Sequence, residues 1–120
     1  MGTRFVVTTI GMVFALGVST AFAFDLEDEH AMESMGAVQM TIRCPDILPN
    51  FELADALFDE MKRRRVRHRD GPLDDLFMAK ALDGERRVKA GETAAYCAEM
   101  ERDYGPGGRI YPDMVIERRR

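Results

Sequence analysis

The sequence predicts an all-α fold, namely a small bundle of three to four short helices stapled by one disulfide. Three observations lead to this class. Apolar residues recur at helical spacing in three segments, and each segment is bounded by capping residues, glycine or proline. No two strand-like segments are joined by the turn residues of a hairpin. The chain of 120 residues contains two cysteines, Cys44 and Cys97, so a single cross-link can close one small domain.

The first 23 residues have the pattern of a cleavable signal peptide. Arg4 supplies a positive start, residues 5–18 are apolar or small, and Ala21 and Ala23 match the small-residue pattern of a cleavage site. The apolar run is shorter than the roughly 20 residues that a membrane-spanning helix needs. We therefore expect cleavage near Ala23, no stable membrane span afterwards, and a periplasmic or secreted protein.

Residues 24–40 are predicted to form an acidic flexible arm, with nascent helix as an open alternative, because large apolar residues are scarce in this segment. Its acidic residues are Asp25, Glu27, Asp28, Glu29 and Glu33. His30, Met32 and Met35 offer imidazole and thioether groups, which on a flexible exported arm would suit copper, particularly the reduced ion. A copper-binding arm is thus one hypothesis. Apart from it, no metal and no cofactor is expected.

The helical domain is predicted over residues 41–117. Asn50 caps a first helix. Its apolar stripe consists of Leu53, Ala54, Leu57, Phe58 and Met61. A second helix is predicted with Asp70 or Gly71 as its cap and Pro72 in its first turn, and Gly84 is its expected end. Its buried face is expected to contain Leu73, Leu76, Phe77 and Ala81, with Leu82 as a further candidate.

A third helix is predicted to open within residues 91–93 and to run through Tyr104, where the glycines and the proline of residues 105–108 stop it. Residues 110–116 are apolar enough to dock on the helices, whereas residues 118–120 form a basic C-terminal tail that should stay in water. The methionines expected to fill the core are Met61, Met78 and Met100.

Cys44 and Cys97 both follow the predicted cleavage site, and an isolated pair in an oxidising compartment most often forms a disulfide. Closing that loop would stabilise the fold by about 4 kcal/mol in the chain-entropy model. A reactive thiol pair is the alternative. The chain has neither a C-x-x-C redox motif nor enough His and Cys for a structural zinc site.

Catalysis is not expected. Ser34 is the one serine after the predicted cleavage site, and His30 and His68 are the two histidines. A serine triad therefore cannot be assembled on a rigid scaffold. The neighbouring carboxylates Asp74 and Asp75 would point apart on a helix and could not share acid–base work. We predict that the protein is not an enzyme.

The densest charge cluster is the basic run at residues 62–69. Its cations are Lys62, Arg63, Arg64, Arg65, Arg67 and Arg69. They either complement the C-terminal end of a solvated helix and the acidic arm, or form an anion- or partner-binding patch. Nucleic acid is not an expected partner, because the formal net charge is −4 and no aromatic residues are interleaved with the cations.

The segment Cys44-Pro45-Asp46-Ile47-Leu48 has a C-x-D-apolar-Leu motif, and Cys97 ends the helical run Ala94-Ala95-Tyr96-Cys97. Over residues 41–104 this pattern resembles the HdeA-type acid-stress chaperones of the bacterial periplasm. The resemblance implies a small helical protein with one disulfide that shields client proteins from aggregation at low pH by exposing buried apolar surface. Pro45, the basic run and the glycine-rich segment after Tyr104 depart from the family pattern.

The sequence therefore predicts a small exported non-enzymatic protein that acts by protein binding in the cell envelope, with chaperone-like action under acid stress. The expected client-binding apolar face contains Leu57, Phe58, Leu76 and Phe77. A dedicated inhibitor, an immunity protein, an accessory subunit and the copper-binding arm are the alternatives. The sequence does not identify the envelope partner, and a homodimer is an open alternative.

Overall fold

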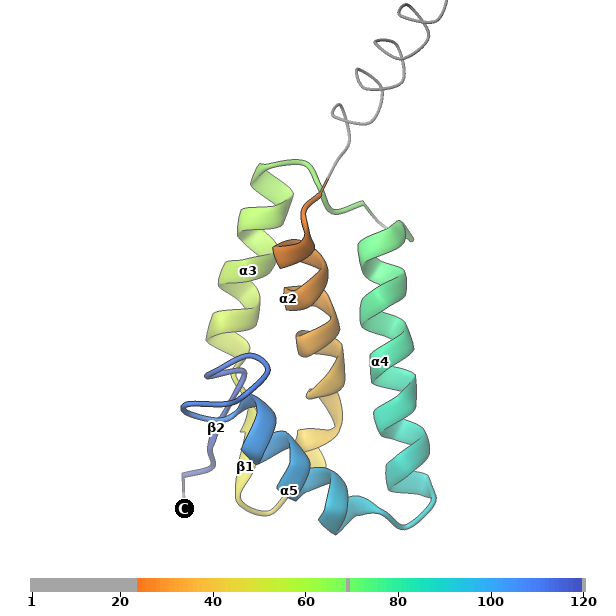
Figure 1. Ribbon diagram of the computed structural model, residues 1–120, viewed down its shortest axis with the longest axis vertical. Helices are drawn as coiled ribbons and strands as arrows, with labels where there is room; N and C mark the ends of the chain where they lie inside the picture. The colour runs from red at the N-terminus through yellow and green to blue at the C-terminus, as the bar shows by residue number, and fades with distance from the viewer. Residues whose placement is uncertain (1–23, 69, 120) are drawn as a thin grey trace, which may run out of the picture.

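The computed structural model describes residues 24–68 and 70–119 (Figure 1). The predicted signal peptide, residues 1–23, lies outside the described residues. In chain order the elements are α2 (Leu26–Ala37), the 3-10 helix η1 (Gln39–Arg43), β1 (Ile47–Pro49), α3 (Phe51–Arg63), α4 (Pro72–Lys89), α5 (Thr93–Tyr104) and β2 (Val115–Glu117). The described chain is mainly helical with one disulfide, which confirms the predicted class. None of the described helices is long and apolar enough to cross a membrane.

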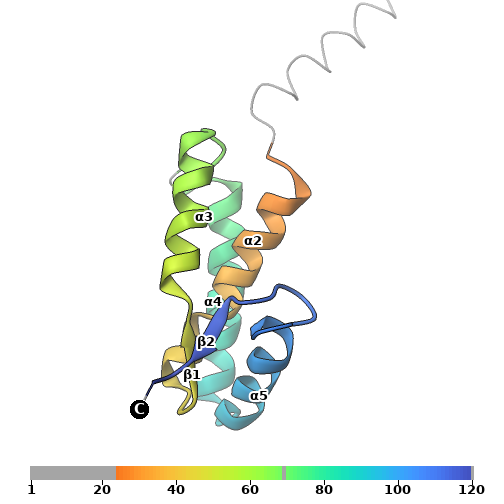
Figure 2. The same ribbon diagram turned by 90° about the vertical axis from the view of Figure 1, so that its left-hand side faces the viewer.

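Helix α2 is the central element of the bundle. It lies between α3 and α4 in Figure 1 and packs most extensively on α4. Figure 2 shows that α5 and the two strands gather at one end of these helices, while the α3–α4 loop lies at the other. At the start of α2 the Asp28 N–H donates to Asp25 (2.9 Å) and the Asp25 N–H donates to Asp28 (3.2 Å), which is a reciprocal capping box.

The predicted flexible arm at residues 24–40 is therefore wrong. Glu27, Asp28 and Glu29 occupy the first turn of α2, where the helix dipole favours negative charge. The buried apolar side chains of this helix are alanine and methionine, namely Ala31, Met32, Met35 and Ala37. An acidic start combined with a face of alanine and methionine resembles the composition of a disordered segment, although it forms the middle of the core.

Gly36 sets the close approach of α2 to α4. A Cβ atom placed on this residue would lie 2.2 Å from the carbonyl oxygen of Phe77. Non-bonded carbon atoms attract best at about 3.5–4.0 Å, so any side chain here would collide with the backbone of α4. Glycine lets the two helices meet at this point through their backbones.

The predicted starts of α3 and α4 are confirmed. Asn50 accepts a hydrogen bond of 3.1 Å from the backbone N–H of Leu53, as an N-terminal cap does. Helix α4 begins at Pro72, directly after the cap residue Gly71. Proline has no backbone N–H, and in the first turn of a helix that N–H would have no partner in the helix anyway. Helix α5 has the predicted bounds.

The predicted end of the second helix at Gly84 is wrong, because α4 continues to Lys89. Gly84 is buried, and a Cβ on it would lie 3.2 Å from Cε1 of the Tyr96 ring. The glycine thus makes room for Tyr96 and does not stop the helix. Among the methionines predicted to fill the core, Met61 and Met100 are buried, whereas Met78 is 50% exposed.

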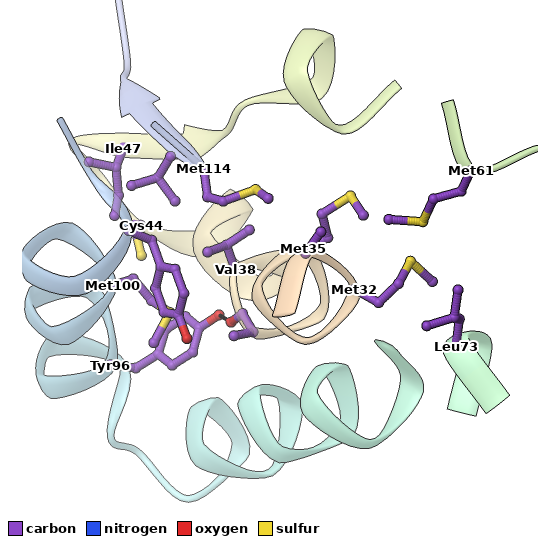
Figure 3. Packing of buried hydrophobic residues seen from close by; sticks show 14 residues of the cluster. Met32, Met35, Val38, Cys44, Ile47, Met61, Leu73, Tyr96, Met100 and Met114 are labelled. Atoms are coloured by element: carbon purple, nitrogen blue, oxygen red, sulfur yellow. Dashed lines mark hydrogen bonds between the residues drawn. The ribbon is translucent and has the colours of Figure 1, made fainter. Parts of the chain in front are cut away.

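Cys44 and Cys97 form the predicted disulfide, across a sequence separation of 53. It joins the residue after η1 to the middle of α5. The neighbouring Tyr96 is buried (Figure 3), and its hydroxyl donates a hydrogen bond to the carbonyl of Ala37 at the end of α2. Burial raises the pKa of Tyr96 to about 12. A covalent bond and a buried hydrogen bond therefore fix α5 to the end of α2 and to η1.

Strands β1 and β2 form an antiparallel pair in which Ile47 lies opposite Glu117 and Pro49 lies opposite Val115. The sequence does not predict this pair, because each strand has only three residues and no hairpin turn connects them. Met114 and Val115 are buried, whereas Ile110 and Ile116 are exposed, so the predicted docking of residues 110–116 is confirmed only for part of the segment.

The basic tail at residues 118–120 does not lie wholly in water as predicted. The Arg118 guanidinium donates hydrogen bonds to the carbonyls of Ile42 (3.1 Å) and Ile47 (3.2 Å). These carbonyls lie in η1 and β1, so Arg118 fastens the end of β2 to them. Arg119 is exposed, and Arg120 lies outside the described residues.

The core is rich in methionine (Figure 3). Five of the fourteen buried apolar residues in the described chain are Met32, Met35, Met61, Met100 and Met114. Thioether side chains are unbranched and adapt to irregular spaces. They fill the interior that α2 shares with the surrounding elements.

Candidate functional site

The predicted client-binding residues Leu57, Phe58, Leu76 and Phe77, hereafter the α3–α4 apolar face, are all half-buried. The rings of Phe58 and Phe77 meet edge to face, with centroids 6.1 Å apart. Leu57 instead lines a hollow of ≈ 270 Å³ between α2 and α3. The structure therefore brings the two phenylalanines together, while Leu57 lines the hollow between α3 and α2.

Helix α3 is the least covered helix of the bundle. Met61 is the only fully buried residue among its 13, and Phe51 at its start is 51% exposed. Helix α2 approaches α3 less extensively than it approaches α4. Because few buried contacts hold α3, we expect this element to open at a lower free energy than the α2–α4 pair.

One ion pair joins the start of α2 to the end of α3. Arg64 donates from Nη2 to Oδ1 of Asp28 at 2.6 Å and from Nη1 to Oδ2 at 3.2 Å, a two-pronged geometry that strengthens the pair. Asp28 is only 4% exposed. The hydrogen bonds from Arg64 hold the pKa of the Asp28 carboxyl below its usual value of 3.8, although burial acts in the opposite direction. The closed bundle therefore favours the carboxylate form of Asp28.

A second carboxylate, Asp74, organises the loop between α3 and α4. Its Oδ1 accepts a hydrogen bond from Arg67 Nε (3.0 Å), and its Oδ2 accepts one from the backbone N–H of Asp70 (3.3 Å). The guanidinium carbon of Arg67 lies 4.4 Å from the centroid of the Phe58 ring, at a cation–π distance. Asp74 thus holds the cation that covers part of the α3–α4 apolar face.

The basic run does not form one open patch. Arg63 pairs with Glu60, Arg64 with Asp28, and Arg67 with Asp74. Lys62 and Arg65 are exposed and form no ion pair with the residues that the structure describes, while Arg69 lies outside them. Most of the described cations therefore have a structural partner, and this favours a structural role for the run over an anion-binding patch.

The hypothesis of a copper-binding arm is wrong in its geometry. Met32 and Met35 are 0% and 1% exposed and belong to the core. Nε2 of His30 lies 2.7 Å from the carbonyl oxygen of Ile110. The centroid of the His30 ring lies 5.2 Å from the centroid of the Tyr111 ring. In residues 24–68 and 70–119 no group of three His, Cys, Asp or Glu side chains could hold a metal ion.

A buried carboxylate also fixes the loop that leads to β2. Asp103 is 5% exposed and accepts hydrogen bonds from Arg102 (3.1 Å) and Arg109 (2.9 Å). Its backbone carbonyl accepts from the N–H groups of Ile110 (2.9 Å) and Tyr111 (3.1 Å). The bonds from Arg102, and then those from Arg109, hold the pKa of the Asp103 carboxyl below its usual value.

Neither buried carboxylate is identified from the sequence. For Asp28 a signal exists, since Asp25 and Asp28 have the spacing of a reciprocal cap at the start of a helix. For Asp103 no local signal exists, because its partner Arg109 reaches it only after the chain reverses through the glycine-rich segment.

Comparison of the chain with protein-family models, with curated proteins and with solved structures finds no match in any of the three. The resemblance to acid-stress chaperones therefore stays a prediction from the sequence motif.

Proposed function

We propose that this is a small exported, non-enzymatic protein of the cell envelope that binds other proteins, and that acid frees α3 so that the α3–α4 apolar face meets unfolded clients. One observation carries the proposal. The helix with the least covered apolar side is held to α2 by the ion pair between the buried carboxylate of Asp28 and Arg64.

The acid response follows from the protonation of Asp28. Its pKa in the folded protein lies below the unfolded value of 3.8, so the stabilisation is present at neutral pH. It is lost as the pH falls through 3.8 toward the lowered value. A protonated carboxyl cannot accept both hydrogen bonds from Arg64, and an unmatched buried group is costly. The closed position of α3 therefore loses stability in acid.

The loop contact lies on the same apolar face. Arg67 is bonded to Asp74 at the start of α4 and lies over the ring of Phe58 on α3. Movement of α3 away from α4 would break this contact and uncover the ring. The released helix then adds apolar surface that can bind an unfolded chain.

Export is supported by two features. Disulfides persist in oxidising compartments, and Cys44 and Cys97 are bonded. The pattern of residues 1–23 is that of a signal peptide. The periplasm in particular follows from the resemblance to the acid-stress chaperones.

The proposal is tested by titrating the protein from pH 7 to pH 2 with a fluorescent hydrophobic dye and an acid-labile model enzyme. We expect dye binding to rise as the pH falls below 3.8, together with protection of the enzyme from aggregation measured by light scattering. The variant F58S should open at the same pH but protect less well. Absence of both dye binding and protection down to pH 2 would contradict the proposal.

The alternatives are separated by cross-linking in the native envelope at neutral and acid pH, followed by mass spectrometry. Many unrelated proteins captured only in acid would support chaperone-like binding. One stoichiometric partner captured at both pH values would instead indicate a dedicated inhibitor, an immunity protein or an accessory subunit. Capture of a second copy alone would indicate a homodimer.

A further inference from the structure

Helix α5 lies at the end of the molecule away from the α3–α4 loop (Figure 1). A groove follows its exposed residues. It begins as an apolar hollow of ≈ 520 Å³ beside the disulfide. Pro45 and Ile47 line one side of it, and Ala94, Cys97 and Ala98 line the other. The small side chains of the two alanines allow another chain to come close to α5.

The groove continues beyond Glu101. A second hollow of ≈ 430 Å³, lined by Pro106, Ile116 and Glu117 among others, shares Glu101 and Ile47 with the first. Glu101 therefore stands between the two hollows. Its carboxylate is exposed, and so is that of Glu117. Neither forms an ion pair within the described part of the chain.

One cation, Arg118, lines the second hollow together with the carboxylates of Glu101 and Glu117. Its guanidinium points to the carbonyls of Ile42 and Ile47, and the nearby Arg102 is bound to Asp103. Among these described residues of the second hollow, the carboxylates therefore outnumber the cation. The apolar hollow has two acidic residues in its lining, Asp46 and Glu101, and no basic one. A negatively charged ligand is therefore disfavoured, whereas a cation is favoured.

We propose that this groove binds an extended segment of a partner protein in which a lysine or arginine follows small apolar residues. The apolar side chains would fill the hollow beside the disulfide, and the cation would meet Glu101 and Glu117. From Ala94 to Glu101 the helix rises about 10 Å, which is the length of about three residues of extended chain. The site is distinct from the α3–α4 apolar face and is open at neutral pH, so it goes beyond the proposed function.

The test uses four capped nonapeptides of alternating alanine and valine that differ only at the central residue, which is lysine, arginine, norleucine or glutamate. Each is added to the oxidised ¹⁵N-labelled protein at pH 7 and followed by amide chemical shifts. We expect the lysine and arginine peptides to shift Ala94, Ala98 and Glu101. The norleucine peptide should bind about tenfold more weakly, since it lacks one charge-assisted hydrogen bond.

Two pairs of variants sharpen the test. E101Q should weaken the lysine peptide about tenfold, while E85Q, on the surface of α4, should leave its binding unchanged. A98W should fill the hollow and abolish binding, while A79W, at an exposed position of α4, should have no effect.

Three outcomes would overturn the proposal. The first is equal binding of all four peptides, and the second is binding that survives A98W. The third is a concentration-dependent shift of the groove residues without any peptide, because a second copy of the chain would then be the occupant. None of these outcomes bears on the acid response of α3, so the two proposals fail independently.

Discussion

Asp28 combines two roles in one buried side chain. It caps the backbone of α2 together with Asp25, and it accepts hydrogen bonds from two guanidinium nitrogens of Arg64. Both roles use the carboxylate oxygens as acceptors. A single protonation therefore weakens a helix start and a helix–helix contact together.

The variant D28N should lower the free energy of unfolding by about 1–3 kcal/mol at pH 7, because an amide offers Arg64 one acceptor in place of two. We expect the lower part of this range, since Arg64 is 40% exposed and solvent screens the pair. The stability of the variant should also depend less on pH around and below 3.8. Urea unfolding followed by circular dichroism at several pH values measures both effects.

E85Q is the matched control, since Glu85 pairs with Lys89 on the surface of α4. Its effect on the acid transition should be small. An equal change in the pH dependence of D28N and E85Q would show that the acid response has no specific origin at Asp28.

At the scale of the elements, the contact between α2 and α4 depends on a residue without a side chain. G36A should improve helix propensity by up to about 1 kcal/mol. Overpacking against the Phe77 carbonyl should outweigh this gain by about 1–3 kcal/mol, so we expect a net loss of stability in urea unfolding. G84A meets side-chain atoms of Tyr96 and Met40 at 3.2–3.5 Å, and no backbone, so it should be milder. A stable G36A protein with unchanged α2 would contradict the close approach.

The disulfide encloses α3 and α4 in one covalent loop and leaves α2 outside it. Replacing both cysteines by serine should lower the free energy of unfolding by about 4 kcal/mol. We also expect the variant to bind hydrophobic dye at a higher pH than the parent protein, because less stability remains to be lost. An unchanged acid midpoint would mean that the loop does not limit the opening.

For the whole molecule, acid changes the balance of charge as well as single contacts. The chain carries 21 Asp and Glu against 17 Lys and Arg, and once the carboxylates are protonated the cations repel one another. Salt shortens the range of this repulsion. At ~0.5 M NaCl the screening is strong. We therefore expect this salt concentration to move the rise in dye binding to lower pH. A midpoint that does not move would show that local contacts alone drive the opening.

Local signals explain which parts of the fold are predictable. Asn50 and Pro72 mark the starts of two helices, and the glycine-rich segment after Tyr104 marks an end, because caps and breakers act over a few residues. The central helix escapes prediction because alanine and methionine form its apolar face. The strand pair depends on a contact between distant segments, which periodicity does not encode.

The candidate site is less predictable than the fold. Phe58 and Phe77 are found by helical spacing, but their half-buried state depends on where α2 lies. The Asp28–Arg64 pair spans 36 residues and requires α2 to be a helix in the first place. The wrong assignment of residues 24–40 to a flexible arm therefore prevents prediction of both the core around α2 and the Asp28–Arg64 contact.

The methionine-rich core has a chemical consequence in an oxidising environment. Oxidants convert accessible methionine to its polar sulfoxide, which disrupts a core. In the closed bundle Met78 is half exposed while Met32 and Met35 are shielded. When the bundle opens in the presence of peroxide, the inner methionines would therefore become accessible and be oxidised to the sulfoxide. A sulfoxide at Met32 would hold the bundle open until a reductase restored the thioether.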